Sequence, residues 1–355
     1  MSIETKGIIM AASVGMLVAT ACNDKVEPDA VPVRQASVTF MTPINGLGDN
    51  SYNDNIAGGV FSFAQHTGVR LGMLQPTDMQ DAERMYRKWL VDHQSADSAV
   101  LILGASAYEP FAAAGPAGIT GNGTRVLLVE SKSETLPDGV SSLYINRYGA
   151  AWLVGAMSRE FDTHIIAASP GFSTVDDAVA GFTDGHAAKR EEERSVRLSY
   201  IADDENGFTM PDSTFRMMYD FYSTNFGCTD MIFPLLGESE KGVIRYANYD
   251  DLFTSLIVGM DVDQSDLCAR IPFSLTVNAG EVIESLLNDW QCGKDWDKVT
   301  VRGLKEGGAG IVFNETFGKN LNVWDDRYST IGVFKNYFDR YYEEAIKMER
   351  QYETK

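Results

Sequence analysis

The chain has 355 residues, of which 44% are hydrophobic and 11% aromatic, a composition that excludes an intrinsically disordered protein and predicts packed cores. Its length exceeds that of one typical domain, so we expect two. With 50 acidic and 30 basic residues the formal charge is −20. Such a field repels nucleic acid and anionic membrane surfaces, and it is compatible with a neutral or cationic small ligand.

The N-terminus predicts export. Residues 7–19 form an apolar run that is shorter than the ~20 residues needed to span a bilayer, and this length is typical of a signal peptide. Ala19-Thr20-Ala21-Cys22 resembles a bacterial lipobox, whose cysteine is lipidated. We therefore expect a signal peptide over residues 1–21, lipidation at Cys22 and a Pro-containing tether over residues 22–36. This predicts a bacterial envelope protein, lipid-anchored to a membrane and facing the periplasm or exterior. The alternative is an apolar helix of the fold itself.

From residue 37 onward, β-like runs alternate with segments of helical spacing. Continuous apolar runs such as AVLIL (99–103) and VLLVE (126–130) are typical of strands buried on both faces. Strands are also predicted at 38–41, 69–74, 143–146, 164–168, 196–202, 231–236 and 255–260. Helices are predicted at 56–66, 78–94, 149–161, 176–193, 211–226 and 242–249.

This alternation is typical of parallel sheets with right-handed crossovers, and there are too many strands for one small sheet. We expect two doubly wound α/β lobes. The first would contain residues 37–146 and about 263–295. The second would contain residues 147–262 and about 296–328.

The C-terminal part follows a different pattern. A helix is predicted at 279–290, followed by strands around a Gly-rich turn at 299–312. A long amphipathic helix, rich in Tyr and Phe, is predicted at 331–352 within a C-terminal segment of residues 329–355. Its apolar face would pack on its own lobe or on a partner.

Sequence motifs argue against catalysis and against a metal or other cofactor. None of the four histidines stands in a known nucleophile motif, and the chain has no GxSxG, HExxH or Walker lysine. No spacing of Cys or His predicts zinc. After Cys22 three cysteines remain, so at least one is unpaired within the chain. They are Cys228, Cys268 and Cys292.

A polar loop over residues 48–55 separates the first strand from the first helix, which is where open α/β sheets bind ligands. Its candidate ligand-binding residues are Asp49, Asn50, Ser51, Tyr52, Asn53 and Asp54. The local alternative is an Asx-type turn that caps the helix.

Other strand ends carry further candidates: Ser106, Tyr108, Phe208, Gly237 and Asp261. In doubly wound lobes these ends converge on one crevice. Rings such as Tyr52 and Phe208 suit stacking on a planar ligand, and carboxylates such as Asp261 suit hydroxyl groups. For each ring, core packing is the alternative.

Five short segments, in order, resemble the basic membrane protein family, the PnrA-like purine-nucleoside-binding lipoproteins of ABC transporters. Residues 48–54 (GDNSYND) resemble its Asp-x-Ser-Phe-Asn signature, and residues 145–156 (INRYGAAWLVGA) resemble its central helix. AGFTDG (180–185), GMDVDQ (259–264) and GLKEGGAG (303–310) resemble its Gly-Phe-x-x-Gly, Gly-Val-Asp-x-Asp-Gln and Gly-Leu-x-x-Gly-Gly motifs. The resemblance covers residues 37–313.

The resemblance implies a type I periplasmic-binding-protein fold with an interlobe crevice, no catalysis, a purine nucleoside as ligand and an ABC permease as partner. It implies Tyr52 and Phe208 on the two faces of the base and Asp261 on the ribose, with residues 106–109 near the base edge. This chain departs from the family pattern at three places. Tyr52 replaces a Phe, Thr42-Pro43 stands near an expected acid, and Val277 stands at an expected lysine. The alternative is a ligand-free or ligand-sensing envelope lipoprotein of the same fold that acts through protein partners.

Overall fold

The computed structural model describes residues 36–93, 98–115, 124–189, 194–224, 230–318 and 330–354. The predictions for the signal peptide, for Cys22 and for all but the last residue of the tether lie outside these ranges, and so does Cys228. Within them, no helix is both long enough and apolar enough to cross a membrane.

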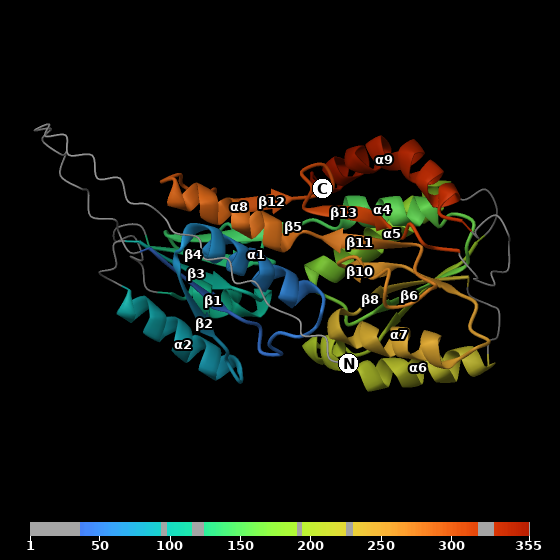
Figure 1. Ribbon diagram of the computed structural model, residues 1–355, viewed down its shortest axis with the longest axis horizontal. Coiled ribbons are helices and arrows are strands. Elements are labelled where there is room, and N and C mark those ends of the chain that lie inside the picture. Colours follow the sequence, from blue (N-terminus) through green and yellow to red (C-terminus); the bar gives the residue numbers. More distant parts are fainter. Residues whose placement is uncertain are drawn as a thin grey trace, which may run out of the picture. The chain divides into compact units, whose positions relative to one another are not determined.

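Lobe 1 is built on a six-stranded, wholly parallel sheet with the order β12-β5-β4-β3-β1-β2 (Figure 1). Its strands are β1 (Ser37–Met41), β2 (Arg70–Leu74), β3 (Ala99–Leu103), β4 (Thr124–Val129), β5 (Val140–Ile145) and β12 (Val299–Arg302). Its helices are α1 (Tyr52–Thr67), α2 (Met79–Asp92), α3 (Glu109–Ala113) and α8 (Ala279–Gln291). As predicted for a sheet covered on both faces, β3 is buried along its whole length.

Lobe 2 has a four-stranded parallel sheet, β7-β6-β8-β9, and a three-stranded sheet, β10-β11-β13. The strands are β6 (Thr163–Ala167), β7 (Val196–Tyr200), β8 (Met231–Leu235), β9 (Leu256–Ile257), β10 (Gly259–Asp261), β11 (Phe273–Val277) and β13 (Ala309–Phe313). Only Val258 separates β9 from β10, and β13 runs antiparallel to β11. The helices are α4 (Tyr148–Met157), α5 (Ser173–Lys189), α6 (Pro211–Thr224) and α7 (Glu240–Tyr249).

Helices α4 and α5 pack backbone to backbone inside lobe 2. A Cβ atom on Gly185 of α5 would lie 1.9 Å from the carbonyl oxygen of Trp152 in α4, and one on Gly155 would lie 2.1 Å from the carbonyl oxygen of Phe182. Only glycine permits this approach. Every residue of α4 is buried, so this helix lies in the core of the lobe.

The chain passes between the lobes three times: after β5, after β11 and after β12. The predicted lobe boundaries are therefore wrong near the C-terminus. Strand β11 pairs in lobe 2, whereas α8 packs on α1 and β12 pairs with β5 in lobe 1. Both strands are apolar enough for either lobe, so hydrophobicity alone could not assign them.

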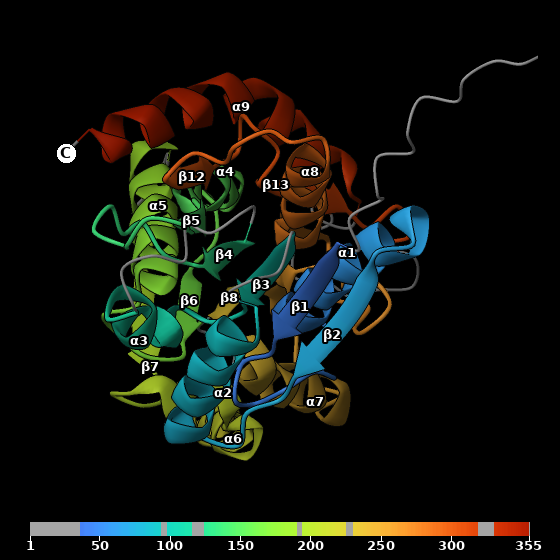
Figure 2. The same cartoon turned by 90° about the vertical axis from the view of Figure 1, so that its left-hand side faces the viewer.

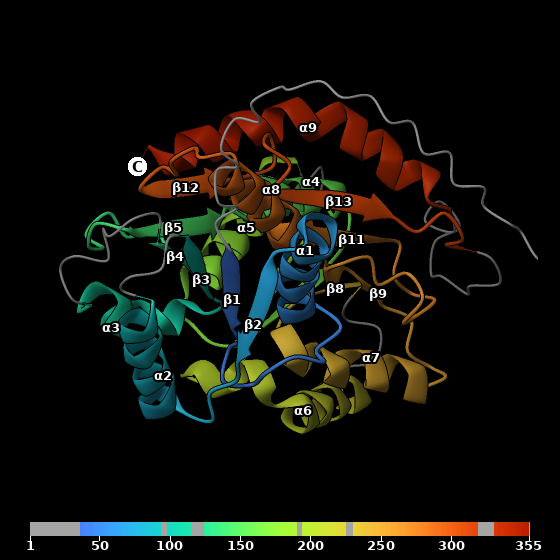
Figure 3. The ribbon, with the colours of Figure 1, turned by 60° about the vertical axis from the view of Figure 1, so that its left-hand side comes forward.

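The last helix, α9 (Gly332–Glu353), lies along α4 (Figures 2 and 3). Its Phe334 side chain is fully buried and contacts the rings of Phe161 and Phe273, at 6.1 and 5.2 Å between centroids. The predicted C-terminal helix is thus confirmed, and its apolar face packs on its own lobe.

Candidate functional site

A cavity of about 460 Å³ lies between the two lobes, at the carboxyl ends of their strands. Cavities of ~300–1,000 Å³ are typical of small-molecule sites. Eight of the eleven predicted ligand-binding residues line it: Asp49, Tyr52, Asn53, Ser106, Tyr108, Phe208, Gly237 and Asp261. The other three, Asn50, Ser51 and Asp54, do not. The convergence of strand ends that the sequence predicted is therefore present.

The loop before α1 is held by two carboxylates, that of Asp49 in the loop and that of Asp54 in the first turn of the helix. Asp49 accepts hydrogen bonds from the backbone amides of Ser51 and Asn53, both at 2.9 Å, and so caps the first turn of α1. Asp54 accepts from the amides of Gly48 and Asn50, both at 2.8 Å. Asp54 was predicted to bind ligand, but its oxygens are used by the loop backbone. The predicted start of α1 at residue 56 is also wrong, because this cap lets the helix begin at Tyr52.

Two contacts connect this loop to lobe 2. The hydroxyl of Ser51 donates to Asp261 Oδ2 at 2.8 Å, and Lys241 Nζ donates to the carbonyl of Gly48 at 3.3 Å. Ser51 thus orients the carboxylate of Asp261 and does not itself line the cavity. Asn53 lines the cavity while its side-chain Nδ2 donates to the Gly46 carbonyl at 3.3 Å.

A buried ion pair, which the sequence did not predict, forms part of the cavity wall. Both nitrogens of the Arg147 guanidinium fork bind Glu130, at 2.8 and 3.1 Å, and the arginine also donates to the carbonyl of Ile145 at 3.0 Å. The side chains of Arg147 and Glu130 are only 8% and 7% exposed. Arg147 is the only basic side chain among the described residues that line the cavity. Its guanidinium carbon lies 5.4 Å from the centre of the Tyr52 ring, in a cation–π arrangement.

Backbone strain is concentrated at this cavity. Within the described part of the chain, only three residues other than glycine have a positive φ: Asn50 (52°), Glu130 (61°) and Asp261 (65°). Glu130 directly follows β4, Asp261 is the last residue of β10, and both line the cavity; Asn50 lies in the loop next to it. Side chains pay about 1–2 kcal/mol for this conformation, so it persists where the surroundings impose it, often at functional sites.

The aromatic candidates divide into two groups. Tyr52 and Phe208 are partly exposed at the cavity, and Phe208 contacts Phe172 edge-to-face at 5.2 Å. Tyr108 is fully buried, and its hydroxyl donates to the Thr42 carbonyl at 2.7 Å. For Tyr108, core packing is therefore the better interpretation.

Burial controls the ionisation of the cavity groups. It raises the pKa of Tyr52 well above its ordinary value, and the nearby Glu130 carboxylate adds to this, so the hydroxyl stays protonated. Burial also raises the pKa of Asp261, while the positive charge of Arg147 and the Ser51 hydrogen bond act in the opposite direction. Burial opposes the charge of Arg147, but Glu130 raises the pKa of this arginine above its ordinary value. The cavity therefore offers a neutral phenol donor, carboxylate acceptors and a fixed cation.

Solved structures with the same architecture are numerous. The chain is similar to an ABC transporter solute-binding protein from Aeropyrum pernix K1 (15% identity, TM-score 0.65, covering 89% of this chain and 90% of that one). It is also similar to a transcriptional activator of the comK gene from Bacillus halodurans (16% identity, TM-score 0.63, covering 86% of this chain and 95% of that one). A third similar structure is GanP, a glucose-galactose binding protein from Geobacillus stearothermophilus (16% identity, TM-score 0.57, covering 79% of this chain and 98% of that one). The chain has the type I periplasmic-binding-protein fold. No family model and no curated protein matches the sequence.

Two predicted departures can now be placed in this periplasmic-binding-protein fold. Val277, where a lysine was expected, is fully buried at the end of β11 opposite Ala309 and does not line the cavity. Thr42 is also buried, and Pro43 reaches the cavity edge. The described residues that line the cavity nevertheless include one cation, Arg147, and five acids: Asp49 and Glu130 of lobe 1, and Glu205, Glu238 and Asp261 of lobe 2.

Nothing in the described part of the chain groups three or more metal-ligating side chains as a metal site would. Besides the exposed pair of His66 Nδ1 and Ser62 Oγ, which lie 3.5 Å apart, the described residues place His164 Nε2 2.9 Å from Ser199 Oγ. This pair lies outside the cavity lining, and burial lowers the pKa of His164 to about 4. Cys268 and Cys292 are free thiols.

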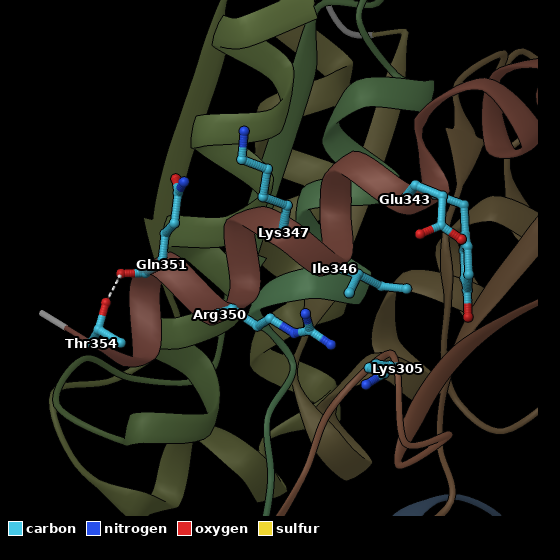
Figure 4. A pocket seen from close by; sticks show the side chains of 8 residues that line it. Lys305, Glu343, Ile346, Lys347, Arg350, Gln351 and Thr354 are labelled. Carbon is cyan, nitrogen blue, oxygen red and sulfur yellow. Dashed lines mark hydrogen bonds between the residues drawn. The ribbon is translucent and has the colours of Figure 1, made fainter.

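A second, open hollow of about 670 Å³ lies along α9, on the outside of the fold (Figure 4). Lys347 and Arg350 of α9 and Lys305 from the loop after β12 form its basic part, and all three are exposed. Among the described residues that line this hollow there is no buried charged pair, and Tyr342 is the only aromatic residue. The interlobe cavity is therefore the candidate ligand site.

Proposed function

We propose that this chain is an extracytoplasmic solute-binding protein that encloses a planar, uncharged ligand such as a purine nucleoside and delivers it to an ABC permease. The observation that carries the proposal is the interlobe cavity, where the Tyr52 ring lies beside the buried Arg147–Glu130 pair and near the carboxylate of Asp261. A cavity of this volume with fixed polar groups and partly exposed rings is the usual form of a small-molecule site.

The charges in the cavity disfavour an anionic ligand. Among the described residues that line the cavity, five carry carboxylates and one is an arginine that is already paired. They belong to Asp49, Glu130, Glu205, Glu238 and Asp261. A phosphorylated ligand would meet this negative field, and the described lining residues provide no unpaired cation to neutralise it. A nucleoside, in contrast, offers a flat base and neutral hydroxyl groups.

Each binding residue has a proposed role that follows from its chemistry. Tyr52 and Phe208 stack on the two faces of the base. Asp261, oriented by Ser51, accepts hydrogen bonds from ribose hydroxyls, and the Asn53 amide contributes polar contacts at the base of the loop. Ser106 lies at the edge of the ring. Gly237 has φ +54° and leaves room for Phe208, whose nearest ring carbon would lie 3.3 Å from an added Cβ.

The cellular setting is also part of the proposal. Lipidation of Cys22, with residues 22–36 as a tether, would hold the binding fold close to a permease in the bacterial envelope. Closure of two lobes around a ligand is the motion by which binding proteins of this kind present their cargo.

Titration calorimetry on ligand-stripped protein tests the proposal. We expect guanosine, inosine or adenosine to bind, and we expect their 5′-monophosphates to bind much more weakly. Tyr52→Ala and Asp261→Ala should each reduce the affinity at least tenfold. Tyr249→Ala, an exposed tyrosine of α7, and Asp263→Ala, an exposed acid two residues from Asp261, are matched controls that should leave it unchanged. If folded wild-type protein binds no nucleoside and no base, the ligand proposal is wrong.

A second candidate function is a ligand-free or ligand-sensing lipoprotein that acts through protein partners. The exposed hollow on α9 favours it, because this chain is acidic as a whole and yet places three basic residues, Lys305, Lys347 and Arg350, on one surface. Reversing the charge of Lys347 and Arg350 should abolish a partner interaction and leave nucleoside binding intact.

A further inference from the structure

The last two turns of α9 contact the chain where it crosses between the lobes. The side chain of Glu349 is 3% exposed, and its two oxygens bind two different crossovers. Oε1 accepts from the amide of Gly149, just after the first crossover, and Oε2 accepts from the amide of Leu304, in the third; both distances are 3.0 Å. One carboxylate therefore joins two of the three segments about which the lobes would rotate.

Two glycines make room for this carboxylate. A Cβ atom on Gly149 would lie 2.6 Å from Glu349 Oε1, and one on Gly303 would lie 2.3 Å from Oε2. Any side chain at either position would push the carboxylate away from the backbone amides. The contacts of Glu349 therefore require a glycine in each of the two crossovers as well as the glutamate of α9.

The crossover segment held by α9 is also the one that presents Arg147 to the cavity. On one side of Arg147, the side-chain Nδ2 of Asn146 donates to Glu353 Oε1 at 2.8 Å. On the other side, the ring of Tyr148 stacks on Tyr352, with centroids 4.0 Å apart and planes 12° apart. Helix α9 thus contacts the residues on both sides of Arg147 without lining the cavity itself.

Tyr352 extends this contact to both lobes. Its hydroxyl donates to Asp177 Oδ1 of α5 at 2.9 Å, and Asp177 Oδ2 accepts from Tyr144 of β5 at 2.5 Å and from Lys132 at 2.9 Å. Asp177 belongs to lobe 2, whereas Tyr144 and Lys132 belong to lobe 1. The far end of α9 is meanwhile anchored in lobe 2 through Phe334.

We propose that the end of α9 is a hinge brace, in which Glu349, Tyr352 and Glu353 act as positioning residues that hold Arg147 in the cavity and set how far the lobes open. This inference rests on the proposed function, because its consequence is a change in ligand affinity from outside the cavity. Without the brace, the segment around Arg147 gains conformational freedom, and ordering it again costs part of the binding free energy.

The test uses the full-length chain and four variants. Glu349→Ala removes both backbone contacts, Glu349→Gln keeps the shape and one acceptor oxygen, and Tyr352→Ala removes the stacked ring. Glu343→Ala, an exposed acid on the outer side of the same helix, is the control. Two quantities are measured at a temperature where all variants are folded: the Kd for guanosine, and hydrogen exchange of residues 145–150 and 303–308 without ligand.

We expect Glu349→Ala and Tyr352→Ala to weaken guanosine binding about tenfold and to accelerate exchange in residues 145–150; Glu349→Ala should also do so in 303–308. Glu349→Gln should recover part of both effects, and Glu343→Ala should change neither. If these residues only stabilise the fold, the substitutions will lower the melting temperature and leave the Kd and the local exchange of the folded protein unchanged. That result would overturn the inference.

The two proposals fail in different ways. If wild-type protein binds no nucleoside, the proposed ligand is wrong, and the exchange measurement alone decides about the brace. In that case, unchanged exchange in Glu349→Ala overturns the brace as well, whereas faster exchange confined to the two crossovers supports it. If wild-type protein binds guanosine and Glu349→Ala binds it equally well, the ligand proposal stands and the brace is wrong.

Discussion

Replacing Arg147 by methionine would test the energetic role of the cavity's buried ion pair. Arg147→Met keeps much of the aliphatic volume and removes both charged hydrogen bonds to Glu130, made at 2.8 and 3.1 Å. Because the Glu130 side chain is 7% exposed, the carboxylate would remain buried without its partner. Breaking a buried pair in this way costs about 3–5 kcal/mol. We therefore expect the unfolding free energy of Arg147→Met to fall by that amount.

A double-mutant cycle separates the pair from the individual residues. In Glu130→Gln/Arg147→Met no uncompensated charge remains, so the double variant should be more stable than the sum of the single effects predicts, by about 1–3 kcal/mol. The assay is urea unfolding followed by circular dichroism at pH 7. Arg245→Met is a matched control, because its pair with Asp212 is exposed and should contribute at most about 1 kcal/mol. A loss below 1 kcal/mol for Arg147→Met, or strictly additive single effects, would refute the reasoning.

Three further predictions concern stability. Asp54→Ala leaves two loop amides without their acceptor and should lower the unfolding free energy by about 1–2 kcal/mol in urea titrations, with a smaller effect for Asp54→Asn. Burial raises the pKa of Glu349 to about 7 from an ordinary value of 4.5. Between these two pKa values Glu349 is protonated in the folded state and ionised in the unfolded state. The protonated group therefore stabilises the fold by about 3 kcal/mol at pH 4.5, and this contribution should be lost as the pH rises to 7.5. Glu349→Gln should lack this contribution, and identical pH profiles would contradict it. Gly185→Ala should lower the melting temperature, because its Cβ would clash with the backbone of α4 and reduce the unfolding free energy by about 1–3 kcal/mol. Gly58→Ala should not lower it, because its Cβ meets nothing within 4 Å.

Local sequence patterns determined much of the fold. Short apolar strands that alternate with helices, most of them 10–17 residues long, specify parallel sheets, because a helix between two parallel strands covers a sheet face. The same patterns placed polar residues at strand ends, and the carboxyl ends of parallel strands share one edge. That is why Tyr52, Phe208 and Asp261 were found to line one cavity although up to 209 positions separate them. The amphipathic C-terminal helix was likewise visible from its period.

Only the tertiary structure decided which residues face one another. Arg147 and Glu130 pair because two adjacent parallel strands, β4 and β5, end side by side, and nothing in an acidic sequence distinguishes this carboxylate from many others. The assignment of β11 and β12 to opposite lobes depends on strand pairing, which hydrophobicity does not encode. Glu349 looks like one more acid of a helix in sequence. It contacts two crossovers because the end of α9 lies next to them. The position of α9 depends in turn on the packing of Phe334, at its other end, in lobe 2.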